Sequence, residues 1–156
     1  CAELYALFSS LSGLPIKQGL AVTGAVNQNG YVLPVGGVNE KINGYFKTCQ
    51  RHGLDGHQGV LIPALNRRHL MLDAAVVQAV AQERFHIYCV AHASEGAELL
   101  MGTPFGSDTL AGGAYAPGSI LALADKRLQA YRRACQRASE APEPRHKTTH
   151  GAKPQN

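Results

Sequence analysis

Apolar and polar residues near the start of the chain alternate with the period of a helix. Four apolar side chains recur three and four positions apart: Leu4, Leu7, Phe8 and Leu11. This spacing places them on one face and predicts a core-facing helix over residues 2–11. Gly13 and Pro15 follow the pattern and predict the end of the helix.

Two short continuous apolar runs come next, and such runs are typical of buried strands. Residues 20–26 predict a buried strand, and residues 31–35 predict a second one. Asn29-Gly30 lies in the polar segment between them, and an Asn-Gly pair tolerates the positive φ angles of a tight turn. The sequence therefore predicts a β-hairpin.

The pattern then alternates between helix and strand up to Gly102. The predicted elements are helix 38–52, strand 59–62, a short helix capped by Asn66, helix 73–81, strand 85–90 and helix 95–101, the last with Ser94 as its N-cap. Alternating strands and amphipathic helices favour an α/β (α+β) fold with helices packed on a small sheet.

Beyond Gly102 the composition changes, which divides the chain into four predicted parts. Residues 1–102 form the domain, and residues 103–118, rich in Gly, Pro, Ser and Ala, form a linker or covering loop. Residues 119–140 recover a helical pattern that suits docking either on the core or on a neighbouring subunit. Residues 141–156 are polar and contain proline, which is typical of a disordered tail.

Composition and charge narrow the class of protein. The 156 residues are 45% hydrophobic and 17% charged, as expected for a globular domain with additional segments. No apolar run approaches the ~20 residues of a membrane span. Four scattered cysteines and seven scattered histidines lack metal-ligand spacing, so we expect free thiols, no metal and no cofactor in this chain.

The formal net charge of +4 is concentrated toward the end of the chain, from Lys126 onward. A basic tail attracts nucleic acid without sequence preference, so non-specific DNA contact is one interpretation. A solvated helix surface followed by a disordered end is the other, and composition alone favours it.

Lys41 is the candidate for chemistry. It lies in the first turns of the helix that follows strand 31–35 and the break at Gly36-Gly37. A neutral lysine can act as a general base, and serine–lysine pairs are a known variant of nucleophilic catalysis. Spacing alone leaves the plainer interpretation open, in which Lys41 is a solvated helix lysine.

Three segments in order carry a family resemblance. They are Ala21-Val22-Thr23-Gly24, Gly36-Gly37-Val38-Asn39-Glu40-Lys41 and Gly59-Val60-Leu61-Ile62-Pro63. Together they resemble the proteolytic domain of Lon-type ATP-dependent serine proteases, and within that family the LonB-like bacterial members. The resemblance covers residues 1–102 and implies a ribosomal protein S5 domain 2-like fold, here without its N-terminal strands.

The resemblance also implies roles for particular residues. Lys41 matches the catalytic lysine, and Thr23 matches the threonine whose hydroxyl supports it. The nucleophilic serine of the family falls three residues before Cys1, so the chain by itself is expected to be an inactive C-terminal piece of a longer protein.

For the whole protein, the resemblance implies proteolysis of protein substrates in the bacterial cytoplasm by a hexameric ring. ATP and Mg²⁺ are expected on an N-terminal ATPase part. The alternative is a non-catalytic Lon-like module for assembly or nucleic-acid binding.

Overall fold

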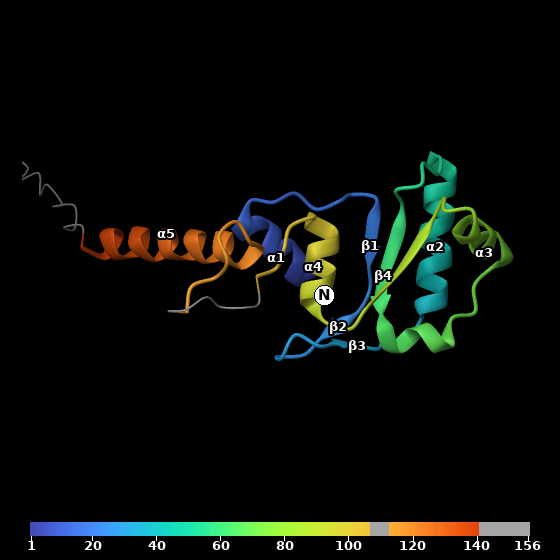
Figure 1. Cartoon of the computed structure of the whole chain (residues 1–156), viewed down its shortest axis with the longest axis horizontal. Coiled ribbons are helices and arrows are strands. Elements are labelled where there is room, and N and C mark those ends of the chain that lie inside the picture. The colour runs from blue at the N-terminus through green and yellow to red at the C-terminus, as the bar shows by residue number, and fades with distance from the viewer. Residues whose placement is uncertain (107–112, 141–156) are drawn as a thin grey trace, which may run out of the picture.

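A three-stranded parallel sheet lies at the centre of the domain (Figure 1). The computed structural model describes residues 1–106 and 113–140. In spatial order the strands are β1 (Leu20–Val22), β4 (Gly59–Pro63) and β5 (His86–Val90). Every residue of the central strand β4 is buried, as expected for a parallel strand with both faces covered.

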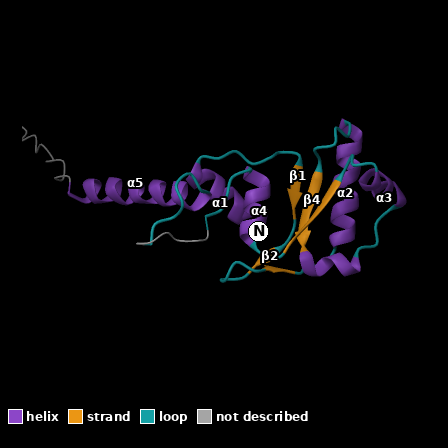
Figure 2. Ribbon diagram, viewed as in Figure 1, coloured by secondary structure: helices purple, strands orange, loops and turns teal. Residues whose placement is uncertain are grey.

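Helices cover both faces of this sheet (Figure 2). The helices on one face are α2 (Val38–His52) and α3 (Ala74–Ala81), and those on the other are α1 (Ala2–Ser12) and α4 (Ala93–Met101). Helix α5 (Ile120–Glu140) packs on α1. The predicted α/β class is confirmed, and the structure shows that the strands of the central sheet are parallel. No helix in the described part of the chain is both long enough and apolar enough to cross a membrane.

The α2 side of the sheet has its own core. Four α2 side chains are buried at helical spacing, namely Val38, Ile42, Phe46 and Cys49. They pack with Val60 and Ile62 of β4, and the Phe46 and Phe85 rings meet edge to face with their centroids 5.2 Å apart. The apolar stripe of α2 is thus buried in the core along the length of the helix.

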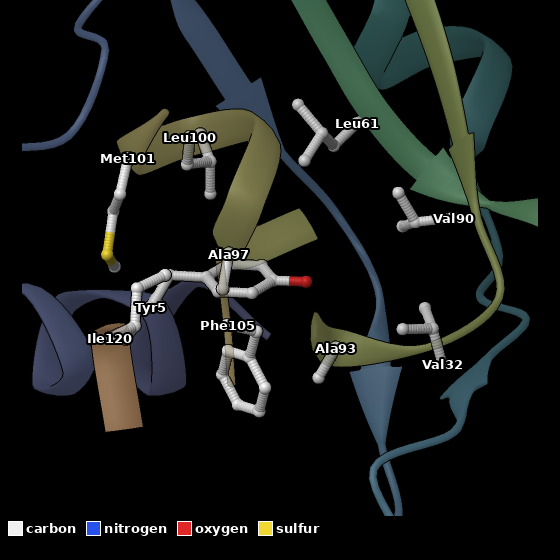
Figure 3. Packing of buried hydrophobic residues seen from close by; sticks show 10 residues of the cluster. All are labelled: Tyr5, Val32, Leu61, Val90, Ala93, Ala97, Leu100, Met101, Phe105 and Ile120. Carbon is white, nitrogen blue, oxygen red and sulfur yellow. The ribbon is translucent and has the colours of Figure 1, made fainter. Parts of the chain in front are cut away.

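The core on the other face of the sheet contains side chains of α1, α4 and the start of α5 (Figure 3). Tyr5 and Ala97 belong to this buried cluster, and Tyr5 is 1% exposed. A Cβ atom on Gly96 would overlap the Tyr5 hydroxyl, so the two helices pack this closely only because residue 96 is glycine. The hydroxyl itself has no hydrogen-bond partner among the described protein atoms.

The predicted strand 20–26 is divided in two, which corrects the sequence-based prediction. Residues 20–22 enter the parallel sheet, whereas β2 (Ala25–Val26) pairs antiparallel with β3 (Val32–Leu33). The chain changes partner at Gly24, where a Cβ atom would lie 3.2 Å from both Cys1 Sγ and Val32 Cγ1. The predicted hairpin forms, but its strands are shorter than the apolar runs.

Two helix starts also differ from the prediction. The N-cap of α4 is His92, not Ser94: the Ser94 N–H donates to His92 Nδ1 at 3.3 Å. The short helix after β4 is a 3₁₀ helix, η1 (Ala64–His69), which begins before Asn66. Asn66 instead pairs with the distant backbone of Val35. His92 caps α4 in place of Ser94 and also contacts the distant Asn29 carbonyl.

The segment after α4 packs on the domain before α5 begins. Phe105 is 9% exposed, and its ring meets Phe8 edge to face with centroids 5.2 Å apart. The Ile120 N–H donates to the Pro104 carbonyl at 3.0 Å, which joins the start of α5 to this segment. Residues 107–112 of the predicted loop and the predicted tail 141–156 lie outside the described residues.

Candidate active site

Lys41 lies in the first turn of α2, directly after the strand-to-helix turn. Gly37 is the N-cap of α2 and adopts a left-handed conformation with φ 67°, which a side chain would make strained. The Lys41 N–H donates to the Gly37 carbonyl at 3.1 Å, closing that first turn. The lysine side chain is exposed and is therefore reachable from solvent.

Thr23 comes to this lysine from the end of β1. The Thr23 N–H donates to the Leu61 carbonyl at 3.0 Å, which extends the pairing of β1 with β4 by one residue. The Thr23 Oγ1 atom accepts a hydrogen bond from Lys41 Nζ at 3.2 Å. The structure therefore brings together the two residues that the sequence singled out.

The start of α1 lies at the same corner. The Cys1 backbone nitrogen donates to the Gly24 carbonyl at 3.1 Å. The start of α1 therefore lies beside Gly24, the residue that follows Thr23. The Ala2, Glu3 and Leu4 N–H groups belong to the first turn of α1, which has no side-chain cap. Such N–H groups have no acceptor within the helix and favour a negative charge nearby.

Asn66 holds the turn before α2 in place, a role that the sequence did not reveal. Its side-chain amide forms two hydrogen bonds with Val35, accepting from the Val35 N–H and donating to the Val35 carbonyl, both at 3.0 Å. Asn66 is distant from Val35 in the sequence, and no local pattern marks an asparagine that pairs with a remote backbone. The contact fixes η1 against the segment that leads to Lys41.

An apolar groove lies along the same end of the sheet. It has a volume of about 350 Å³ and is lined by Tyr31, Val32, Leu33, Ala64, Leu65 and Ala91. Tyr31 and Leu65 are 58% and 54% exposed. An apolar surface between β3 and η1 is therefore open to solvent.

Other titratable residues have structural roles. Glu98 Oε1 accepts a hydrogen bond from the Phe105 N–H at 2.7 Å and so ties segment 103–106 to α4. His92 Nε2 lies 3.0 Å from the Asn29 carbonyl and therefore donates to it. Within residues 1–106 and 113–140, no three His, Cys, Asp or Glu side chains gather as metal ligands would.

The comparison with protein families identifies the class. The family described as "Lon protease (S16) C-terminal proteolytic domain" matches residues 1–101, which is well over half of the chain. The chain belongs to this family. The match ends with α4, and α5 lies beyond it.

Relatives with assigned names agree with this. The chain is 47% identical over 100 residues to a protein of Escherichia coli strain K12 named "Putative Lon protease homolog", covering 64% of this chain and 17% of that protein. It is 36% identical over 101 residues to the "Archaeal Lon protease" of Halobacterium salinarum, covering 64% of this chain and 12% of that protein. The chain therefore spans less than a fifth of the length of these relatives.

Proposed function

We propose that this domain is the part of a serine–lysine peptidase that supplies the general base, with Lys41 as that base and Thr23 as its positioning residue. The observation that carries the proposal is the hydrogen bond from Lys41 Nζ to Thr23 Oγ1 at 3.2 Å, beside the start of α1. Membership of the Lon protease family supports it.

In the proposed reaction, the neutral Lys41 amine takes the proton of a serine hydroxyl while the serine oxygen attacks the peptide carbonyl. The resulting ammonium returns the proton to the leaving amine, and a water molecule deprotonated by the same lysine hydrolyses the acyl-enzyme. The Thr23 hydroxyl accepts one lysine hydrogen, which leaves the nitrogen lone pair to face the serine. The first N–H groups of α1 are suited to stabilise the oxyanion.

The serine is expected three residues before Cys1, by resemblance to the family. Two serines of α1, Ser9 and Ser12, form hydrogen bonds at the opposite end of that helix, which supports a structural role for them. Ser9 Oγ donates to the Leu14 carbonyl at 2.6 Å, and Ser12 Oγ accepts from the Leu14 N–H at 3.3 Å. We therefore expect residues 1–156 by themselves to be inactive, and the proposal requires the complete gene product.

The proposal extends to the whole protein. We expect ATP-dependent cleavage of protein substrates by a hexameric ring, with ATP and Mg²⁺ bound outside this chain, and an S5 domain 2-like fold for the proteolytic domain. The second candidate is a non-catalytic Lon-like module for assembly or nucleic-acid binding. The exposure of Leu128 and Tyr131 on α5 is the observation that supports an assembly role.

The test is lysine replacement in the complete gene product purified from its source. Lys41→Arg keeps the positive charge but removes a side chain able to lose a proton. We expect peptide hydrolysis to fall by about 10³-fold or more, as for loss of a general base acting on a nucleophile. Thr23→Val should reduce the rate less, because the base remains but is no longer oriented.

Lys47→Arg is the matched control. Lys47 lies on the same helix and pairs with Asp73 at 3.6 Å on the surface, so its replacement should leave the rate unchanged. Circular dichroism checks that each variant is folded. Substantial hydrolysis by folded Lys41→Arg protein contradicts the assignment of the general base.

A further inference from the structure

The apolar stripe of α5 continues beyond the domain that buries its first part. Six residues recur three and four positions apart along the helix, namely Leu121, Ala124, Leu128, Tyr131, Cys135 and Ala138. Ala124 is 5% exposed against the core, whereas Leu128 and Tyr131 are each 50% exposed. The stripe has the spacing of a coiled-coil seam, and only its first part is covered.

The uncovered half, residues 126–139, projects from the molecule (Figure 1). α5 packs on α1, but α1 ends at Ser12, and every described side chain from Lys126 to Ser139 is exposed. This half is about 21 Å long at 1.5 Å per residue. An isolated helix of this length is marginal in water and is normally stabilised by packing of its apolar face.

The charge of this half indicates what kind of surface would cover it. Its sequence contains no aspartate or glutamate, and its cations are Lys126, Arg127, Arg132, Arg133 and Arg137. By helical geometry, Arg127 and Arg132 flank the seam on its two sides. Lys126, Arg133 and Arg137 line the opposite face around Ala130 and Ala134.

We infer that the outer half of α5 is a docking surface for an acidic amphipathic helix. The partner helix would continue along α5 where α1 stops, cover Leu128 and Tyr131, and place carboxylates beside Arg127 and Arg132. Flanking charges of opposite sign select the partner and its orientation in such helix pairs. The inference does not depend on the proposed catalytic role of Lys41.

Two other occupants fit the observations less well. A second copy of this chain would bring like-charged flanks together at Arg127 and Arg132, which disfavours pairing. Nucleic acid would neutralise the cations but leave Leu128 and Tyr131 in water. Its phosphates would also bind the cations beside the seam and those on the opposite face equally well. Only an acidic amphipathic helix uses both the seam and its flanks.

The test measures binding of a designed peptide to the whole chain of 156 residues. The probe is a fluorescent peptide about three heptads long, with leucine at its seam positions and glutamate at its flanking positions. Fluorescence anisotropy at several salt concentrations gives its affinity. We expect saturable binding that weakens as salt increases, because the flanking ion pairs are partly exposed.

Three double variants separate the contributions of seam, flanks and net charge. Leu128→Ser with Tyr131→Ser removes the seam, and Arg127→Glu with Arg132→Glu reverses its flanks. Each should weaken binding by about tenfold or more. Arg133→Glu with Arg137→Glu makes the same charge change on the opposite face and should alter affinity by no more than about threefold.

Four outcomes would overturn the inference. The first is no peptide binding by the unaltered chain, and the second is equal loss of peptide binding from both charge reversals. The third is saturable binding of duplex DNA that the seam variant leaves unchanged while the peptide fails to bind. The fourth is self-association in sedimentation that the seam variant abolishes. Thermal unfolding should be the same for all variants, since every described side chain from Lys126 to Ser139 is exposed.

Discussion

Helices α2 and α5 carry similar apolar stripes but lie in different surroundings. In α2 the stripe meets β4 and Phe85 along its whole length, and Ile42 and Phe46 are 0% and 3% exposed. In α5 the stripe is buried at Ala124, close to the buried Ile120, and its later residues extend beyond the domain. Helical periodicity therefore reports that a face is apolar, and the neighbouring elements decide whether that face is covered.

The difference in burial between α2 and α5 bears on the functions proposed for the two helices. Burial of α2 fixes the helix whose first turn holds Lys41, as the catalytic role proposed for Lys41 requires. The outer half of α5 contributes nothing to the core and lies beyond the family match at residue 101. One helix is suited to hold a site, and the other is suited to meet a partner.

Removing a large α2 side chain should have the largest effect on stability. Phe46→Ala leaves a cavity between α2 and Phe85, and such truncations cost about 3–5 kcal/mol. We expect the free energy of unfolding, measured by urea denaturation, to fall by that amount. A loss below about 1 kcal/mol would show that this core is loosely packed and would remove the contrast with α5.

A smaller effect is expected within α5, and it should depend on position. Ile120→Ala removes a side chain that is 0% exposed and should cost about 2–4 kcal/mol. Leu128→Ala, on the same helix, should change the free energy of unfolding by no more than about 0.5 kcal/mol. Equal costs for the two variants would mean that the outer half packs on the domain in solution.

Effects smaller than that of Ile120→Ala are expected for two tyrosines on opposite faces of the sheet. Tyr5→Phe removes a buried hydroxyl without a partner and should be neutral or stabilising by about 1 kcal/mol. Tyr45→Phe is the control: its hydroxyl donates to the Gly19 carbonyl at 3.0 Å, so its loss should destabilise by about 1 kcal/mol. Denaturation at neutral pH distinguishes the signs.

Tyr5→Phe should also change how the free energy of unfolding depends on pH in alkaline solution. Burial, together with the nearby charge of Glu95, raises the pKa of Tyr5 from 10.0 to about 12. The folded state thus favours the neutral phenol, and this contribution to stability is fully present below pH 10.0 and is lost as the pH rises through about 12. Tyr5→Phe should therefore lose less stability over that interval than the unaltered chain, provided that both are measured in one buffer series.

Most elements of the fold followed from the sequence, because their signals are local. The helices that contain Lys41 and Leu128, and the hairpin turn at Asn29-Gly30, were predicted close to their observed bounds. The family resemblance was also predicted and is confirmed by the match over residues 1–101. The catalytic roles of Lys41 and Thr23 stay predictions.

The errors concern residues whose partners lie far away in the sequence. The run 20–26 has one apolar pattern, but Gly24 changes its neighbour from β4 to β3, and a pattern contains no information about neighbours. Ser94 suits an N-cap by residue type, yet His92 fills that position and also contacts Asn29. Both outcomes depend on atoms supplied by other segments.

The sequence by itself determined the secondary-structure periods, the distribution of charge and the motifs that mark the family, since each is a property of neighbouring residues. Tertiary structure alone decided that Thr23 Oγ1 meets Lys41 Nζ, that Asn66 pairs with Val35, and that the stripe of α5 is covered only as far as Ala124. The physical reason is that hydrogen bonds and burial depend on which groups approach within a few ångströms, and chain folding brings those groups together from distant positions.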